Sequence, residues 1–172
     1  MQCAEGQCDK VALVVTIAGG KCGFKDGDAS SGLLCKPLDV AVADKGALII
    51  SDYHNHRIRR LSSDGQLSTI AGSSYGYAEG QGAAAKFYYP VGIDVAPDGV
   101  IYVADMSNHR IRRVTASGKV STLAGGKAGS ADGMATLASF YQPTDVAVGD
   151  KGNIYVVDRG NHKIRVVASS GK

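Results

Sequence analysis

Short runs of alternating apolar and polar residues follow one another along the chain, and turn-forming residues separate them. In the middle of the chain, residues 91–96 alternate and end at the turn Pro97-Asp98-Gly99. A run rich in β-branched residues covers 100–105, residues 109–114 alternate apolar with cationic side chains, and a further run covers 120–124. Alternation with a period of two predicts half-buried strands, and Pro, Asp and Gly predict the turns between them. The pattern predicts four short antiparallel strands.

This four-strand pattern occurs three times with a fixed period of 53 residues. The period is visible in the series Pro37, Pro90 and Pro143 and in the series Gly46, Gly99 and Gly152. A fixed period of this length marks a stacked or radial architecture, and four antiparallel strands per repeat are typical of a β-propeller blade. We therefore predict an all-β fold with propeller blades at residues 37–72, 90–125 and 143–172.

The blades are unequal in one respect. Residues 14–19 align with the fourth strand of a blade, whereas the third blade has no fourth strand of its own. Propellers typically need at least four blades, and three blades leave sheet edges open. We expect residues 14–19 to complete the third blade, either of a partner or of the same chain, and two chains to form a six-bladed ring as a homodimer. A fragment of a longer propeller and a designed or reconstructed half-propeller stay open as alternatives.

The repeated segments resemble a known family. The segments that carry the resemblance are Pro90–Val95, Ile101–Asp105 and Asn108–Arg112, each with counterparts in the other two blades. They are similar to the NHL repeat, and the resemblance covers nearly everything from Val14 to Val167. It implies β-propellers, most often six-bladed. It also implies two possible activities, because some NHL propellers bind RNA on a basic face and some six-bladed relatives are lyases or hydrolases with unique metal ligands or a unique acid.

Composition and motifs narrow the function. The chain has 172 residues, a net charge of +3 and no tryptophan, so the Trp-Asp signature of another propeller class is absent. It has no run of 18 apolar residues, which argues against a membrane span. His-Glu-x-x-His and P-loop motifs are absent, and almost every candidate catalytic residue is repeated. We predict a non-catalytic scaffold for protein or peptide partners. The alternatives are an RNA-binding module and part of a propeller lyase or hydrolase with a channel metal.

Four cysteines, at positions 3, 8, 22 and 35, fall outside the repeat pattern. Residues 1–13 are expected to form a cysteine-containing N-terminal extension. A Cys22–Cys35 disulfide would close a short loop, whereas the alternative is free thiols in a reducing compartment. Because no histidine lies near these cysteines, a zinc site is disfavoured. The cysteines favour a secreted or extracellular protein, but the localisation stays open.

Three groups of repeated or neighbouring residues are candidates for a site. A structural turn role is predicted for Asp52, Asn55, His56, Asp105, Asn108, His109, Asp158, Asn161 and His162, whose carboxylates are expected to cap the tight turn. Candidate binding residues are Arg59, Arg112 and Arg165 together with Tyr75, Tyr77, Tyr88 and Tyr89. The arginines form either a band of positive charge around the ring or ion pairs with nearby aspartates.

A possible cation site lies on the first strand of each blade, which lines the channel of a propeller. Asp39 and Asp145 occupy the position that Gly92 holds in the middle blade. In a six-bladed dimer this gives four carboxylates near the axis. Because oxygen-rich sites suit Ca²⁺ or Mg²⁺, Ca²⁺ in the central channel is a candidate cofactor, and no other cofactor is expected.

Overall fold

The computed structural model describes residues 12–168, and in this range the protein is built from antiparallel strands and short 3₁₀ turns, with no α-helix. No helix in the described range is long and apolar enough to cross a membrane. The all-β prediction is therefore confirmed.

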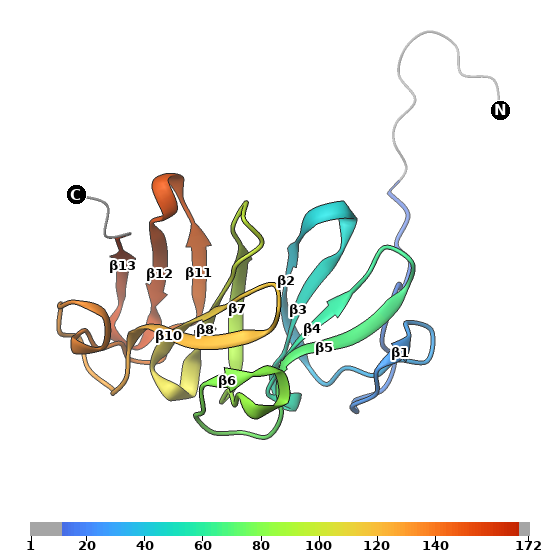
Figure 1. Ribbon diagram of the computed structural model, residues 1–172, viewed down its shortest axis with the longest axis horizontal. Coiled ribbons are helices and arrows are strands. Elements are labelled where there is room, and N and C mark those ends of the chain that lie inside the picture. Colours follow the sequence, from blue (N-terminus) through green and yellow to red (C-terminus); the bar gives the residue numbers. More distant parts are fainter. Residues whose placement is uncertain (1–11, 169–172) are drawn as a thin grey trace, which may run out of the picture.

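The strands form three antiparallel sheets (Figure 1). The first sheet has the order β1-β5-β4-β3-β2 and contains β1 (Gly27–Asp28), β2 (Pro37–Val42), β3 (Leu48–Asp52), β4 (Arg57–Leu61) and β5 (Gln66–Gly72). The second has the order β6-β10-β9-β8-β7 and contains β6 (Gly80–Gln81), β7 (Pro90–Val95), β8 (Ile101–Asp105), β9 (Arg110–Val114) and β10 (Lys119–Gly125). The third contains β11 (Asp145–Val148), β12 (Ile154–Asp158) and β13 (Lys163–Val167). We refer to these sheets as blades 1, 2 and 3.

Short 3₁₀ turns connect several strands: η1 (Asp44–Gly46), η2 (Tyr53–Asn55), η3 (Gly82–Ala84), η4 (Met106–Asn108), η5 (Ala135–Leu137), η6 (Asp150–Gly152) and η7 (Arg159–Asn161). The turns η2, η4 and η7 join the second and third long strands of each blade, and a histidine follows each of them in the left-handed conformation. These turns place the repeated Asp, Asn and His side chains at one end of each blade.

The short outer strands β1 and β6 are features that the sequence pattern does not reveal. Each lies in the loop before a blade's first long strand and pairs with the outermost long strand, β5 or β10. Both contain only two residues, Gly-Asp and Gly-Gln, so no alternation marks them. They fold each interblade loop back onto a sheet edge.

The blades stand side by side through their first strands. Strand β2 contacts β7, and β7 contacts β11 (Figure 1). Between blades 1 and 2, Ile58, Phe87 and Ile93 belong to one buried core. Ile111, Phe140 and Val146 occupy the equivalent positions in the core between blades 2 and 3. The two junctions are thus built from the same repeat positions, and Phe87 and Phe140 anchor the interblade loops in them.

Residues 14–19 do not form a strand within the single chain. Val14, Val15 and Ile17 are exposed. A strand requires a hydrogen-bonding neighbour, and no strand of the described chain pairs with this segment. Blade 3 accordingly has three strands, and β13 is an open edge.

Candidate binding site

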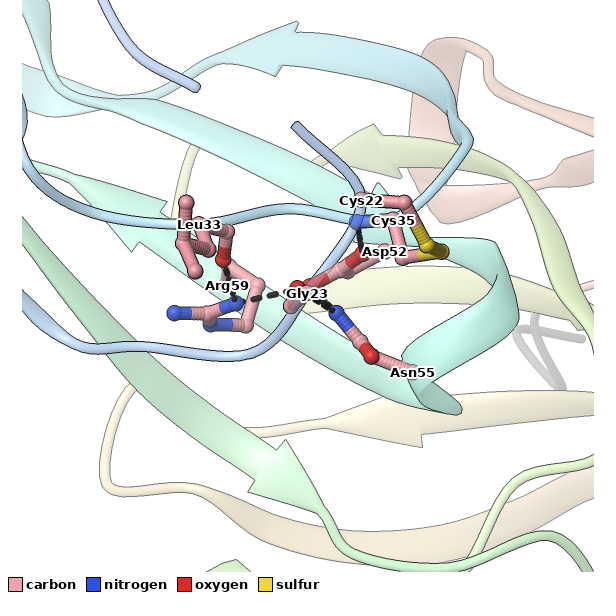
Figure 2. Close-up of a disulfide and its surroundings, with 7 residues drawn as sticks. All are labelled: Cys22, Gly23, Leu33, Cys35, Asp52, Asn55 and Arg59. Carbon is pink, nitrogen blue, oxygen red and sulfur yellow. Dashed lines mark hydrogen bonds and ion pairs between the residues drawn. A yellow bond between two sulfur atoms is a disulfide. The ribbon is translucent and has the colours of Figure 1, made fainter. Parts of the chain in front are cut away.

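A buried aspartate ends the second long strand of each blade and organises its surroundings. In blade 1, Asp52 Oδ1 accepts a hydrogen bond from the Cys35 amide at 2.7 Å. Its Oδ2 accepts hydrogen bonds from Asn55 Nδ2 at 2.8 Å and from Arg59 Nη1 at 2.7 Å (Figure 2). Asp105 and Asp158 make the equivalent contacts in blades 2 and 3. Each carboxylate therefore ties together its own turn, the neighbouring strand and the interblade loop.

The asparagine of each turn adds a hydrogen bond to a backbone carbonyl on the far side of the interblade loop. Asn55 Nδ2 also donates to the Gly23 carbonyl at 2.7 Å, and Asn108 and Asn161 donate to the carbonyls of Gly76 and Gly129. None of the 3₁₀ turns has a side-chain cap. The expectation that the aspartates cap the tight turn is therefore wrong. They accept backbone amides that lie 17 residues earlier in the chain.

The middle arginines do not form an exposed basic band. Arg59 and Arg112 are both 0% exposed, and their guanidinium groups pair with Asp52 and Asp105. Arg59 also donates to the carbonyl of Leu33 at 3.1 Å. Because a buried cation without a partner is costly, these contacts hold the arginines inside the blades. Only Arg165, on the open side of blade 3, is partly exposed.

Aromatic rings cover the arginines from outside. The Phe24 ring lies 3.9 Å from the Arg57 guanidinium and 4.9 Å from that of Arg59. Tyr77, one repeat later, covers Arg110 and Arg112 at the same two distances. Tyr77 is thus part of a cation–π stack that supports the fold, and it lies apart from the other tyrosines predicted to bind a ligand.

Histidines of the turn connect neighbouring blades. His56 Nδ1 accepts a hydrogen bond from the Tyr89 amide at 3.3 Å, and His109 Nδ1 accepts one from the Gln142 amide at 3.1 Å. Burial lowers the pKa of His56, and the positive charges of His54 and Arg57 lower it further. Burial also lowers the pKa of His109. A lowered pKa keeps both imidazoles neutral near pH 7, as an acceptor nitrogen requires.

Six aromatic side chains gather where blades 1 and 2 meet. This aromatic cluster consists of Tyr53, His54, His56, Tyr75, Tyr88 and Tyr89. Tyr53 stacks on Tyr89 with 4.6 Å between ring centroids, and Tyr88 lies 5.0 Å from Tyr89. Tyr75 contacts Tyr88 at 5.7 Å and is itself exposed. The structure therefore brings together three of the four tyrosines that were candidates for binding.

Two members of the cluster, Tyr53 and His54, are absent from the candidates derived from the sequence. Both lie at the start of the blade 1 turn, and His54 is exposed. Their signal in the sequence is departure from the repeat, because Met106 and Arg159 stand at the position of Tyr53. Ring faces that are partly exposed offer stacking and apolar contact to a ligand with a flat or apolar group.

The carboxylates of the first strands accept hydrogen bonds from backbone amides of the protein itself. Asp39 accepts amide hydrogen bonds from Val40 and, across the blade junction, from Ile93, each at 2.8 Å. Asp94 accepts from Val95 and from Val148 in the same way. Asp145 accepts from Val146. Among the described residues no group of three His, Cys, Asp or Glu side chains could hold a metal ion. Asp39 and Asp145 therefore belong to no such group in the single chain, and the Ca²⁺ site expected from four carboxylates of a dimer stays a prediction.

The predicted disulfide is present. Cys22 and Cys35 are joined with 4.2 Å between their Cα atoms (Figure 2). These positions are equivalent to Tyr75 and Tyr88 in the next blade, whose rings are in contact. The bond thus occupies in the first interblade loop the place that an aromatic pair occupies in the second. Cys3 and Cys8 lie outside the described residues.

The comparisons with known proteins agree with this architecture. The family model of the NHL repeat matches residues 34–61, 87–114 and 140–167, one match in each blade. The chain is an NHL-repeat protein. Each match ends with the third long strand of its blade and begins just before the first.

Several curated proteins share this NHL region. The chain is 30% identical over 149 residues to NHL repeat-containing protein 2 of Bos taurus, covering 77% of this chain and 20% of that protein. It is 37% identical over 95 residues to Protein SUPPRESSOR OF QUENCHING 1, chloroplastic, of Arabidopsis thaliana, covering 54% and 9%. Human teneurin-4 is 27% identical over 153 residues, covering 78% and 6%. The chain therefore spans at most 20% of the length of these three relatives.

Solved structures with the same fold are β-propeller-like proteins. An auxiliary nutrient binding protein from Bacteroides thetaiotaomicron superposes with a TM-score of 0.67 at 24% identity, covering 75% of this chain and 36% of that chain. Virginiamycin B lyase from Staphylococcus aureus superposes with a TM-score of 0.58 at 18% identity, covering 78% and 38%. At these identities the likeness shows the propeller fold.

Proposed function

We propose that this NHL protein is a non-catalytic scaffold that binds a protein or peptide through the aromatic cluster between blades 1 and 2. The observation that carries the proposal is the cluster itself. Its members gather at one blade junction and leave ring faces exposed, and four of them, Tyr53, His54, Tyr75 and Tyr89, depart from the repeat. Tyrosine-rich surfaces suit peptide recognition because a rigid ring provides a large contact area and its hydroxyl provides a hydrogen bond.

The absence of catalysis is part of the proposal. Repeated polar groups have structural partners, since Asp52, Asp105 and Asp158 hold buried or partly buried arginines. The first-strand carboxylates accept backbone amides. Among the described residues, no group of three His, Cys, Asp or Glu side chains could hold a metal ion. These engagements support a binding role over the lyase or hydrolase alternative.

The assembled scaffold is a six-bladed ring made by two copies of the chain. The support is that β13 is an unpaired edge in the described chain, and that Val40 and Ile164 are exposed whereas their counterparts at the internal junctions are buried. In the ring the aromatic cluster would occur twice, on the same face. A partner with two equivalent binding segments would therefore gain from engaging both copies.

A selection with a random-sequence peptide display library tests the binding role. We expect wild-type protein to enrich peptides that the double variant Tyr53→Ala/Tyr75→Ala does not retain. The variant Tyr155→Ala, which removes a half-exposed tyrosine in blade 3, is the matched control and should retain the same peptides. Enrichment that is equal on the double variant would contradict the assignment of the cluster.

A parallel selection with a random single-stranded RNA pool separates the two classes of ligand. Because Arg59 and Arg112 are buried, we expect no RNA enrichment at physiological salt. RNA binding that weakens steeply with added salt would favour a nucleic-acid ligand over a peptide.

A further inference from the structure

Blades 1 and 3 each expose a face that is buried in the other blades. Ile164 of β13 is 72% exposed, whereas the equivalent Ile58 and Ile111 are 0% exposed. On the opposite side of the arc, Val40 of β2 is 56% exposed, whereas the equivalent Ile93 is 4% exposed. The two faces are the two halves of a blade junction, each without its counterpart in the described chain.

The two junctions within the chain show what each half contacts. Ile58 shares a buried core with Phe87 and Ile93 of the following blade. At the next junction, Ile111 shares a core with Phe140 and the valine at position 146. Moving these contacts by one repeat places Leu34 and Val40 opposite Ile164. The open face of blade 3 is therefore complementary to the open face of blade 1.

Residues 13–19, called the arm, end at Gly19 in the conformation and contact that end a fourth long strand in blade 1. Gly19 has φ +87°, close to the +99° of Gly72, which ends the fourth long strand of blade 1. Leu34 is the nearest neighbour of the Gly19 Cβ position, as Phe87 is among the nearest neighbours of that of Gly72. At Gly19 the arm therefore meets blade 1 as β5 meets blade 2 at Gly72. A fourth strand presented in this way needs the free edge of a third strand, and β13 has the equivalent edge unpaired.

We propose that a second copy of the chain covers both open faces, with each arm pairing along β13 of its partner. The proposal rests on the six-bladed ring proposed above and specifies its interface. The register of the arm on β13 follows from that of β5 on β4 and of β10 on β9, transferred to the equivalent repeat positions. It includes the same bulge before Ala18. The resulting pairs are Val167 with Val14, Val166 with Val15, Arg165 with Thr16, Ile164 with Ala18 and Lys163 with Gly19. In blades 1 and 2 the equivalent cross-strand pairs are Arg60 with Ser68 and Arg113 with Ser121, so both members change from polar to apolar together in the Val166–Val15 pair.

A polar contact completes the junction. His56 and His109 each accept the amide of the residue before the next blade's proline, at Tyr89 and Gln142. The equivalent acceptor in blade 3 is His162, and the equivalent donor before blade 1 is the Lys36 amide. Lys36 has φ +49°, like Tyr89 at +56° and Gln142 at +51°, so its amide is already oriented as in the other blades.

Two copies are sufficient because the two halves of the junction are on opposite ends of one arc. Joining the C-terminal face of each copy to the N-terminal face of the other creates two identical junctions related by a two-fold axis. The ring closes without a free sheet edge at either junction. Three blades from each copy give the six blades that the repeat length and family favour.

The first test is the native mass of the full chain, measured by native mass spectrometry and by light scattering after size exclusion. We expect twice the chain mass of 17.8 kDa. Ile164→Asp should give a monomer that keeps its β-sheet circular dichroism spectrum, because Ile164 is exposed in the single chain. Met134→Asp, which changes an exposed apolar residue in the loop between blades 2 and 3, should stay dimeric. A monomeric wild type, or a dimeric Ile164→Asp variant, would overturn the proposal.

A cross-link tests the register. In a Cys3→Ser/Cys8→Ser background, Val15→Cys combined with Val166→Cys should form a disulfide-linked dimer under mild oxidation. Val15→Cys combined with Arg165→Cys places the thiols on opposite faces of the paired strands and should cross-link poorly. Equal cross-linking would exclude the proposed register. These readouts do not involve a ligand, so a dimer that enriches no peptide would refute the binding role alone, and a monomer that enriches peptides would refute the ring alone.

Discussion

Asp52 and Arg59 form an ion pair of 2.7 Å in which neither side chain is exposed. The pair links the second and third long strands of blade 1 at the point where the interblade loop returns. Asp105 and Arg112 repeat it in blade 2 at 2.8 Å. The repeated Asp and Arg side chains therefore hold the strands of each blade together. Of the two arrangements considered for the arginines, the ion pairs with nearby aspartates are the one observed.

Removing the carboxylate charge from this frame should be strongly destabilising. Asp105→Asn leaves the buried Arg112 cation without a counterion, and breaking a buried pair in this way costs about 3–5 kcal/mol of unfolding free energy. Urea denaturation of the full chain at a fixed protein concentration measures the loss. Asp44→Asn, an exposed aspartate on η1, should change the unfolding free energy by less than about 0.5 kcal/mol. A loss below about 1 kcal/mol for Asp105→Asn would mean that the pair is dispensable.

Blades 2 and 3 approach each other so closely at position 92 that only glycine fits there. A Cβ at Gly92 would lie 2.5 Å from Asp145 Cα and 2.7 Å from the Thr144 carbonyl oxygen. Gly92→Ala should therefore separate the first strands and lower stability by about 1–3 kcal/mol, the usual range for overpacking. Gly20→Ala adds a methyl group with nothing within 4 Å and should be nearly neutral. Comparing the urea denaturation midpoints of the two variants tests this expectation. Equal midpoints would argue against tight packing at this junction.

The Cys22–Cys35 disulfide should stabilise the first interblade loop. It joins residues 13 positions apart, and in the chain-entropy model a loop of this size contributes about 3 kcal/mol. In a Cys3→Ser/Cys8→Ser background, reduction should lower the melting temperature. A further Cys22→Ser/Cys35→Ser change should lower it by a similar amount and make it insensitive to reductant. A melting temperature that reductant does not change in the parent would show that the bond does not form in solution.

Stability should depend on pH through Asp145. Burial raises the pKa of this carboxyl, and the negative charges of Asp39 and Asp94 raise it further. A raised pKa means that the folded protein binds the proton more tightly than the unfolded chain. The favourable contribution is therefore complete below the usual pKa of 3.8 and is lost as the pH rises through the folded value.

Asp145→Asn should consequently raise the melting temperature at pH 7, and this advantage should shrink as the pH falls through the raised pKa of Asp145 and vanish below about 3.8. The asparagine carbonyl can still accept the Val146 amide, so the change isolates the charge. Asp150→Asn, on the exposed turn η6, provides the control. A variant that is less stable than wild type at pH 7 would show that the Asp145 charge has a favourable partner in solution.

Much of the architecture can be derived from the sequence because the blade is encoded by local patterns. Alternation in the runs around Ile93, Val103 and Ile111 specifies which faces of the strands are apolar. The fixed spacing of Pro37, Pro90 and Pro143 specifies where each blade begins. These signals require no knowledge of distant contacts, since strand alternation and turn chemistry act over a few residues. The Cys22–Cys35 disulfide could be predicted because the cysteines fall outside the repeat and this pair closes a short loop.

Tertiary structure decided what the repeated polar residues do. The sequence shows that Asp52 and Arg59 recur, but only the fold buries Arg59 against Asp52 and leaves no exposed guanidinium at that position. It also brings Tyr53 from one blade against Tyr89 from the next, and so creates the aromatic cluster. Burial and side-chain contact depend on segments that are far apart in the chain, and no local pattern records those distances. The sequence by itself determined the blades, and the packing of one blade on the next determined the site.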